Sequence, residues 1–296
     1  MLHIELPECV APVGDRCGEG AVWHAGEQAL YWVDINRFLI HRLDAQTNSV
    51  KSWMFDEPVT AMILTDQDDT LAVVFGSKAQ LLKPATNTLG RVLFQLPTWP
   101  TMRCNDARAD PRGSLWIGTM RNNVGTAGED LEVPFVDGVL YRVDPDGGVS
   151  EWKHGIGISN TLAWSPGKDR FYFGDTVANR ICVWSYDAAT GAIAGERPFL
   201  DGLPYGLPDG STMDAEGYLW NARPGAGCIV RIAPDGSLQH TLALPVPKPT
   251  TCTFGGPDLT TLYITTMGTT ERLAGSLFAV RTNVRGLPEN RFRIGK

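Results

Sequence analysis

The chain has 296 residues, and the regular repeat spacing described below favours one large domain over residues 1–296 rather than two smaller ones. Its 43% hydrophobic and 20% charged residues are typical of a folded globular protein. The net charge of −7 argues against nucleic-acid binding, which needs a basic patch. No apolar run reaches the ~18 residues of a membrane span, and the N-terminus lacks the features of a signal peptide, so a cytoplasmic location is expected.

Six cysteines occur without a Cys-x-x-Cys pair. A core of this size does not need disulfides and zinc-type spacing is absent, so reduced, mostly buried thiols are expected.

Six short apolar runs with β character recur along the chain. They are Ala29–Ile35, Thr70–Gly76, Ser114–Met120, Arg170–Thr176, Tyr218–Pro224 and Thr261–Met267. Their anchors Leu30, Leu71, Leu115, Phe171, Leu219 and Leu262 are separated by 41, 44, 56, 48 and 43 positions. Turns rich in Pro, Gly and Asp, a third alternating strand and an outer strand accompany these runs. Four strands per repeat, six times over, predict an all-β fold, a six-bladed β-propeller.

Two further expectations concern the ends and the loops of this ring. The alternating segment Leu2–Leu6 is the candidate to complete the last blade and close the ring. The widest repeat contains Arg121–Phe135, which is expected to form a longer loop over one face.

A polar residue recurs 10 or 11 positions before most anchors. The equivalent positions are Glu19, Thr60, Asn105, Asn160, Asp209 and Cys252. Equivalent positions in a closed ring of repeats converge on its axis, and four of these side chains offer the oxygen ligands that hard divalent cations prefer. The pattern predicts a metal site at the central channel.

The ligand set expected from this pattern is Glu19, Asn160 and Asp209. Each of these residues alone could be a turn cap, but two carboxylates converging on the axis without a cation would repel each other and lose solvation. Ca²⁺ is the ion expected first, with Mg²⁺, Mn²⁺, Zn²⁺ and Fe²⁺ as alternatives. None of the five histidines falls at an axial position.

Two residues of the third repeat are candidates for substrate contact. Asn105 shares the axial phase and could reach the ion through water or substrate. Arg103 lies two positions earlier, where it could hold a substrate carbonyl or hydroxyl groups, or pair with Asp106.

Seven short motifs, in order along nearly the whole chain, resemble one family. They are Gly18-Glu-Gly20 followed by Val22-Trp23, Tyr31-Trp-Val-Asp34, Arg103-x-Asn-Asp106, Trp116-Ile-Gly-Thr-Met120, Ser159-Asn160 followed by Leu162-Ala-Trp164, Pro208-Asp-Gly210, and Gly255-Gly-Pro-Asp258 before Leu262-Tyr263. Together they resemble the senescence marker protein/regucalcin/gluconolactonase family of sugar lactonases.

The resemblance implies hydrolysis of an aldonolactone, a pentono- or hexonolactone, to the aldonic acid, with one divalent ion held by Glu19, Asn160 and Asp209. It also implies that Asn105 lies close to the ion and that Arg103 contacts substrate. Some members place a Glu after the motif that ends at Met120. Here the stretch is Arg121-Asn-Asn123, in which Asn122 could still bond sugar hydroxyls.

In the mechanism expected from these residues, the ion polarises the lactone carbonyl and Asp209 is the general base, with hydroxide on the ion as the competing nucleophile. Arg103, Asn105 and Asn122 would orient the ester. The alternatives are a metal-dependent phosphotriesterase or paraoxonase-like hydrolase, a propeller whose Ca²⁺ only stabilises the fold, and a non-catalytic interaction scaffold. The expected partner is a small-molecule sugar lactone, with no nucleic acid and no membrane, and the chain is expected to be a monomer.

Overall fold

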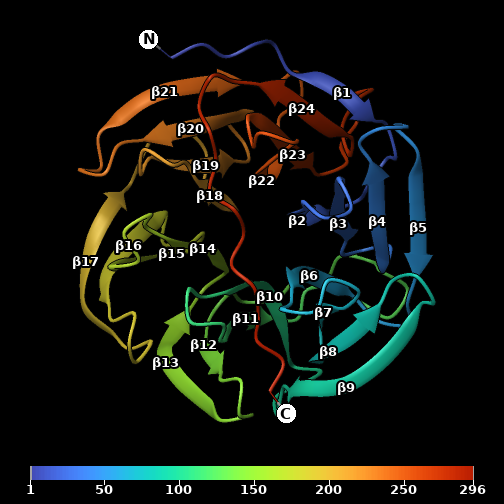
Figure 1. Ribbon diagram of the computed structural model, residues 1–296, viewed down its shortest axis with the longest axis vertical. Coiled ribbons are helices and arrows are strands. Elements are labelled where there is room, and N and C mark those ends of the chain that lie inside the picture. The colour runs from blue at the N-terminus through green and yellow to red at the C-terminus, as the bar shows by residue number, and fades with distance from the viewer. Residues whose placement is uncertain (1, 296) are drawn as a thin grey trace.

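The computed structural model describes residues 2–295, which form 24 strands and no helix in six four-stranded antiparallel sheets around a central axis (Figure 1). The prediction of a six-bladed β-propeller is confirmed. The described residues therefore include no helix that is long and apolar enough to cross a membrane.

Each sheet is a blade with its first strand nearest the axis. The first blade contains β2 (Gly18–His24), β3 (Ala29–Asp34), β4 (Leu39–Asp44) and β5 (Val50–Met54). The second contains β6 (Val59–Leu64), β7 (Leu71–Phe75), β8 (Lys78–Lys83) and β9 (Thr88–Gln95). The third contains β10 (Met102–Ala109), β11 (Leu115–Arg121), β12 (Gly138–Val143) and β13 (Val149–Ile156).

The fourth blade contains β14 (Ser159–Trp164), β15 (Arg170–Asp175), β16 (Arg180–Tyr186) and β17 (Ile193–Asp201). The fifth contains β18 (Ser211–Met213), β19 (Leu219–Arg223), β20 (Cys228–Ile232) and β21 (Leu238–Ala243). The last contains β22 (Pro249–Gly255), β23 (Thr261–Thr266), β24 (Leu277–Arg281) and β1 (Glu8–Ala11). The six apolar runs of the sequence are the second strands of the blades, as expected.

The ring is closed by the N-terminal part of the chain, but by a later segment than the one expected. β1, rather than Leu2–Leu6, pairs with β24. The expected segment lies alongside the same blade, since Ile4 forms a single bridge with Thr282. Leu2–Leu6 alternates apolar and polar residues, whereas β1 reads Glu8-Cys-Val-Ala11 without alternation, so the pattern pointed to the earlier segment.

Apolar side chains between neighbouring blades form the core. Second-strand tryptophans are fully buried in it, and each indole N–H donates to a buried aspartate, as in the bond from Trp116 to Asp110 and the bond from Trp220 to Asp214. These bonds satisfy the indole donors inside the core. All six cysteines are free thiols and four of them are buried, as the sequence predicted.

The six inner strands contact one another around the axis in the order β2, β6, β10, β14, β18, β22. We call the end of the ring at which these strands begin the upper face and the opposite end the lower face. Residues 282–295, which follow β24, cross the middle of the ring in Figure 1. Leu287 bonds to Met213 of the fifth blade, and Phe292 bonds to Leu64 of the second. The C-terminal segment therefore ties blades together across the lower face.

Candidate active site

Irregular backbone lies at the axial position of five of the six inner strands, and β18 is the exception. The register with the second strand shifts after Glu19 in β2, around Thr60 in β6, after Cys104 in β10, after Asn160 in β14 and before Cys252 in β22. A β-bulge bends a strand locally and redirects a side chain. The repeat phase seen in the sequence therefore corresponds to a repeated bulge at one height of the channel.

Two carboxylates meet at this height. Glu19 comes from β2, and Asp209 comes from the residues just before β18. Burial is the main cause that raises the pKa of Glu19 well above its usual value, and the charge of Asp209 is the second. Burial also raises the pKa of Asp209, although a hydrogen bond with Glu19 acts in the opposite direction. Two acids this close in a poorly solvated site cannot both ionise without cost unless a cation lies between them.

Asn160 is fixed beside the pair by a chain of hydrogen bonds. Its Nδ2 donates to Oγ1 of Thr176 at 2.8 Å, and Thr176 Oγ1 donates to the carbonyl of Pro208 at 2.7 Å. The amide nitrogen is thus occupied, whereas the amide oxygen accepts only a long hydrogen bond, from Asn105 Nδ2 at 3.5 Å, among the described residues. The same chain connects Asn160 to the residue that precedes Asp209.

The backbone of Asp209 is held from two sides. Its carbonyl accepts a hydrogen bond from Thr161 Oγ1 and another, at 2.9 Å, from Asn221 Nδ2. Thr161 has a φ of +55°, which is unfavourable for a β-branched residue. The residue that follows Asn160 therefore adopts a strained conformation in which its hydroxyl reaches the Asp209 segment.

Arg103 and Asn105 form a second polar group next to the carboxylates. Arg103 Nη1 donates to Asn105 Oδ1 at 2.6 Å, and Asn105 Nδ2 donates to the carbonyl of Ser159 at 2.8 Å. Among the hydrogen bonds and ion pairs of the described residues, Arg103 makes none with Asp106, which was one of the two alternatives the sequence left open. Both amide atoms of Asn105 already have protein partners, so this side chain is less free to ligate an ion directly than Asn160.

Sequence reasoning missed Asn123. Its Oδ1 accepts hydrogen bonds from Nε and Nη2 of Arg103, at 3.0 and 2.8 Å. Asn122, the residue proposed from the sequence, instead uses Oδ1 to accept the backbone N–H of Val124 within the loop. The two asparagines are adjacent, and nothing in the sequence indicated which of them would face Arg103.

The donor set fits a hard divalent cation. It comprises two carboxylates whose pKa values are raised by burial and an amide whose nitrogen is already bonded. No cluster of three His, Cys, Asp or Glu side chains suited to a metal occurs within residues 2–295. The fit therefore depends on the amide oxygen of Asn160 as the third protein ligand.

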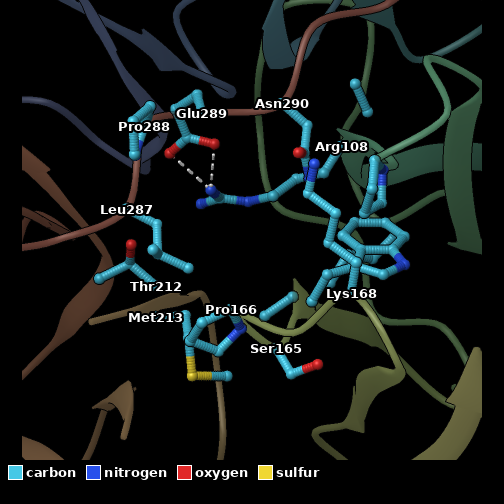
Figure 2. A pocket seen from close by; sticks show the side chains of 15 residues that line it. Arg108, Ser165, Pro166, Lys168, Thr212, Met213, Leu287, Pro288, Glu289 and Asn290 are labelled. Atoms are coloured by element: carbon cyan, nitrogen blue, oxygen red, sulfur yellow. Dashed lines mark hydrogen bonds and ion pairs between the residues drawn. The ribbon is translucent and has the colours of Figure 1, made fainter. Parts of the chain in front are cut away.

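Below the carboxylates a second charged group involves the C-terminal segment. Arg108 of β10 donates to both carboxylate oxygens of Glu289, at 2.8 and 2.9 Å, and Thr253 donates to Glu289 at 3.0 Å. Figure 2 shows Glu289 of the C-terminal segment facing Arg108 beside a cavity of about 300 Å³ on the lower face. The C-terminal segment therefore lies across the lower end of the channel.

We expect this ion pair to be needed for stability. The two side chains are only 16% and 15% exposed, so Glu289→Gln should leave a poorly solvated guanidinium without its anion and lower the free energy of unfolding by about 3 kcal/mol. Urea unfolding measures the loss. The double variant Arg108→Met with Glu289→Leu removes both charges and should be less destabilised than Glu289→Gln. A double variant at least as destabilised as Glu289→Gln would contradict the pairing.

Asp106 should make the stability of the ion-free protein depend on pH. Burial raises its pKa to about 6, Arg108 opposes the shift, and the charge of Glu289 adds to it; Asp106 in turn raises the pKa of both Glu19 and Asp209. Because the folded pKa lies above the ordinary 3.8, the folded state favours protonated Asp106. The stability that protonated Asp106 contributes to the folded state is present below about pH 4 and is lost as the pH rises through about 6.

Urea unfolding of chelator-treated protein at several pH values between about 4 and 7.5 measures this dependence. Asp106→Asn should show a shallower fall in stability over that range than the original chain. An equally steep fall in the variant would assign the pH dependence to other groups.

Together, the fold and the site define a class of protein: a six-bladed β-propeller with two interacting carboxylates at its axis and a C-terminal segment across its lower face. A family model described as the SMP-30/Gluconolactonase/LRE-like region matches residues 17–268, and the chain belongs to this family.

Relatives match over most of their length. The chain is 35% identical to the pentonolactonase XacC of Haloferax volcanii, with 93% of this chain and 94% of the relative covered. It is 34% identical to the 6-deoxy-6-sulfogluconolactonase of Pseudomonas putida, with 97% and 99% covered. Among solved structures, the calcium-binding protein regucalcin from Agrobacterium tumefaciens is 28% identical, with a TM-score of 0.88 and 96% of each chain covered.

Proposed function

We propose that the chain is a divalent-ion-dependent sugar lactonase that hydrolyses an aldonolactone to the aldonic acid. The observation that carries the proposal is the pair of interacting carboxylates, Glu19 and Asp209, beside the oriented amide of Asn160. The names of the two lactonase relatives support a sugar lactone as the substrate class.

Glu19, Asn160 and Asp209 would hold the ion. Ca²⁺ is the first candidate because the donors are all oxygen and a structural relative is a calcium-binding protein. When bound, the ion would supply Lewis-acid polarisation of the lactone carbonyl as its oxygen gains negative charge.

The protein groups would bind and orient the lactone and move the proton. Arg103 would donate to the lactone carbonyl or to ring hydroxyls, with its guanidinium plane fixed by Asn123 and Asn105. The amide nitrogen of Asn122 would add a donor to sugar hydroxyls. Asp209 would accept the proton of the attacking water as the ester bond opens. The two hydrogen bonds that hold its backbone would keep the carboxylate in place for this transfer.

Hydrolysis assays on two substrate classes test the proposal. Chelator-stripped protein supplied with single ions is assayed on pentono- and hexonolactones and on a phosphotriester. Ion-restored hydrolysis of one or more lactones, well above that of the phosphotriester, is expected. Faster phosphotriester hydrolysis would favour the rival enzyme class, and no hydrolysis with any ion would leave a structural or binding role for the site.

A further inference from the structure

Arg223 is a buried cation without a carboxylate partner. It is the last residue of β19, and its side chain has no measurable exposure. Its hydrogen-bond acceptors among the described residues are all neutral oxygens: the carbonyls of Tyr205, Leu203 and Gly206 and the amide oxygens of Asn221 and Asn179. Burial lowers its pKa to about 10, so it stays charged at neutral pH.

Such a cation is costly to bury unless its donors are satisfied. Three of the five acceptors belong to the loop of residues 202–208, which runs from β17 of the fourth blade to Asp209. The shortest bond, at 2.6 Å, joins Arg223 Nε to the carbonyl of Tyr205. The side chain therefore serves mainly to fasten this loop.

The loop is pressed closely against the end of β19. Gly206 has a φ of +59°, and a Cβ at this residue would lie 2.2 Å from the carbonyl oxygen of Pro224. Backbone bonds continue the attachment, from Leu207 N to Pro224 O at 3.2 Å and from Asp209 N to Ala222 O at 3.0 Å. The loop has no room to shift toward β19.

Arg223 also contacts the residue that holds Asp209. Its Nη1 donates to Asn221 Oδ1 at 3.2 Å, and Asn221 Nδ2 donates to the Asp209 carbonyl at 2.9 Å. This bond fixes which end of the Asn221 amide faces Asp209. Arg223 therefore acts on Asp209 along two routes, through the loop that precedes it and through Asn221.

We propose that Arg223 is a positioning residue, which fastens loop 202–208 to β19 and so sets the place of the Asp209 carboxylate relative to Glu19. This inference rests on the proposed function of Asp209. Loss of the fastening should lower kcat and weaken ion binding, since a displacement of about 1 Å in a catalytic group can cost about 10²-fold in rate.

Two glycines in the loop give a matched test that leaves Arg223 intact. Gly206→Ala introduces the clash with Pro224, whereas Gly202→Ala, at a similar φ of +68°, meets nothing within 4 Å. Both variants bear the same kind of backbone strain. We expect Gly206→Ala to lower kcat by at least about 10-fold, with KM changed by less than about 3-fold and a weaker ion affinity by calorimetry. Gly202→Ala should remain within about 2-fold of the original chain in all three.

Substitutions of the arginine complete the test. Arg223→Met should lower kcat and ion affinity, and Arg223→Lys should recover some thermal stability but little kcat, because one ammonium cannot reach five acceptors. The control is Arg231→Met, which removes a buried arginine of the same blade that pairs with Asp214. It should lower the melting temperature and leave kcat and ion affinity at 25 °C unchanged.

The outcomes separate this inference from the proposed function. If the original chain binds an ion and hydrolyses a lactone but Gly206→Ala behaves like Gly202→Ala, the positioning role is wrong and the function stands. If the original chain binds ions without hydrolysis, the ion affinities of Gly206→Ala and Gly202→Ala decide whether the positioning role holds. If it does neither, both proposals fail together.

Discussion

Asp209→Asn is expected to reduce kcat for lactone hydrolysis by at least about 10²-fold, the lower end of what a positioned general base contributes. The substitution keeps the shape of the side chain and the backbone bonds to Thr161 and Asn221. It removes the group that would accept the proton and half of the negative charge offered to the ion. Steady-state kinetics at saturating ion concentration measure the effect of losing the base, because weaker ion binding no longer limits the rate.

The chain supplies a matched control for this variant. Pro234-Asp235-Gly236 repeats the tripeptide Pro208-Asp209-Gly210 in the same blade, but Asp235 is exposed in a turn. Asp235→Asn should leave kcat and ion affinity unchanged. Near-normal turnover by Asp209→Asn at saturating ion would remove Asp209 from the catalytic role.

Glu19→Gln is expected to reverse the effect of the ion on stability. Without ion, the variant should be more stable than the original chain, because Glu19 and Asp209 no longer repel each other. With ion, it should be less stable, because one of two carboxylate ligands is gone. An ion at about 100 times its Kd stabilises the original chain by about 2.7 kcal/mol, or roughly 5–10 °C in a protein of this size.

If the variant binds the ion about 100-fold more weakly, the same ion concentration adds only about 0.4 kcal/mol. Thermal unfolding of chelator-stripped protein, with and without added ion, measures both effects. Glu8→Gln, an exposed position on β1, is the control and should follow the original chain. An equal ion-induced rise in the melting temperature of Glu19→Gln would place the ion elsewhere.

The fold could be predicted because each blade repeats one local pattern. The apolar second strands and the turns between them recur at nearly constant spacing, and only a closed ring buries all of them. The axial position could also be predicted, since Glu19, Asn160 and their equivalents recur 10 or 11 positions before the anchors. The sequence therefore predicted that Glu19 and Asp209 would both lie at the axis.

Other features depend on contacts that local patterns do not encode. Arg108 and Glu289 are 181 residues apart, and nothing near either residue indicates the other. Arg223 lies in a strand where an arginine reads as an ordinary surface residue, yet the fold buries it completely. Asn122 and Asn123 are adjacent in one loop, and the sequence does not indicate which of them bonds to Arg103. Loop geometry and ion pairs between distant parts of the chain thus could not be predicted from the sequence.

The measurement that tests the central claim most directly is proton release from an aldonolactone in a single continuous assay. Chelator is added during turnover, and single divalent ions are then added back in excess. The account predicts that hydrolysis by the original chain stops with chelator and resumes with Ca²⁺ or another single ion, and that Asp209→Asn shows neither phase. Hydrolysis that continues unchanged in excess chelator would contradict an ion-dependent site at the axis.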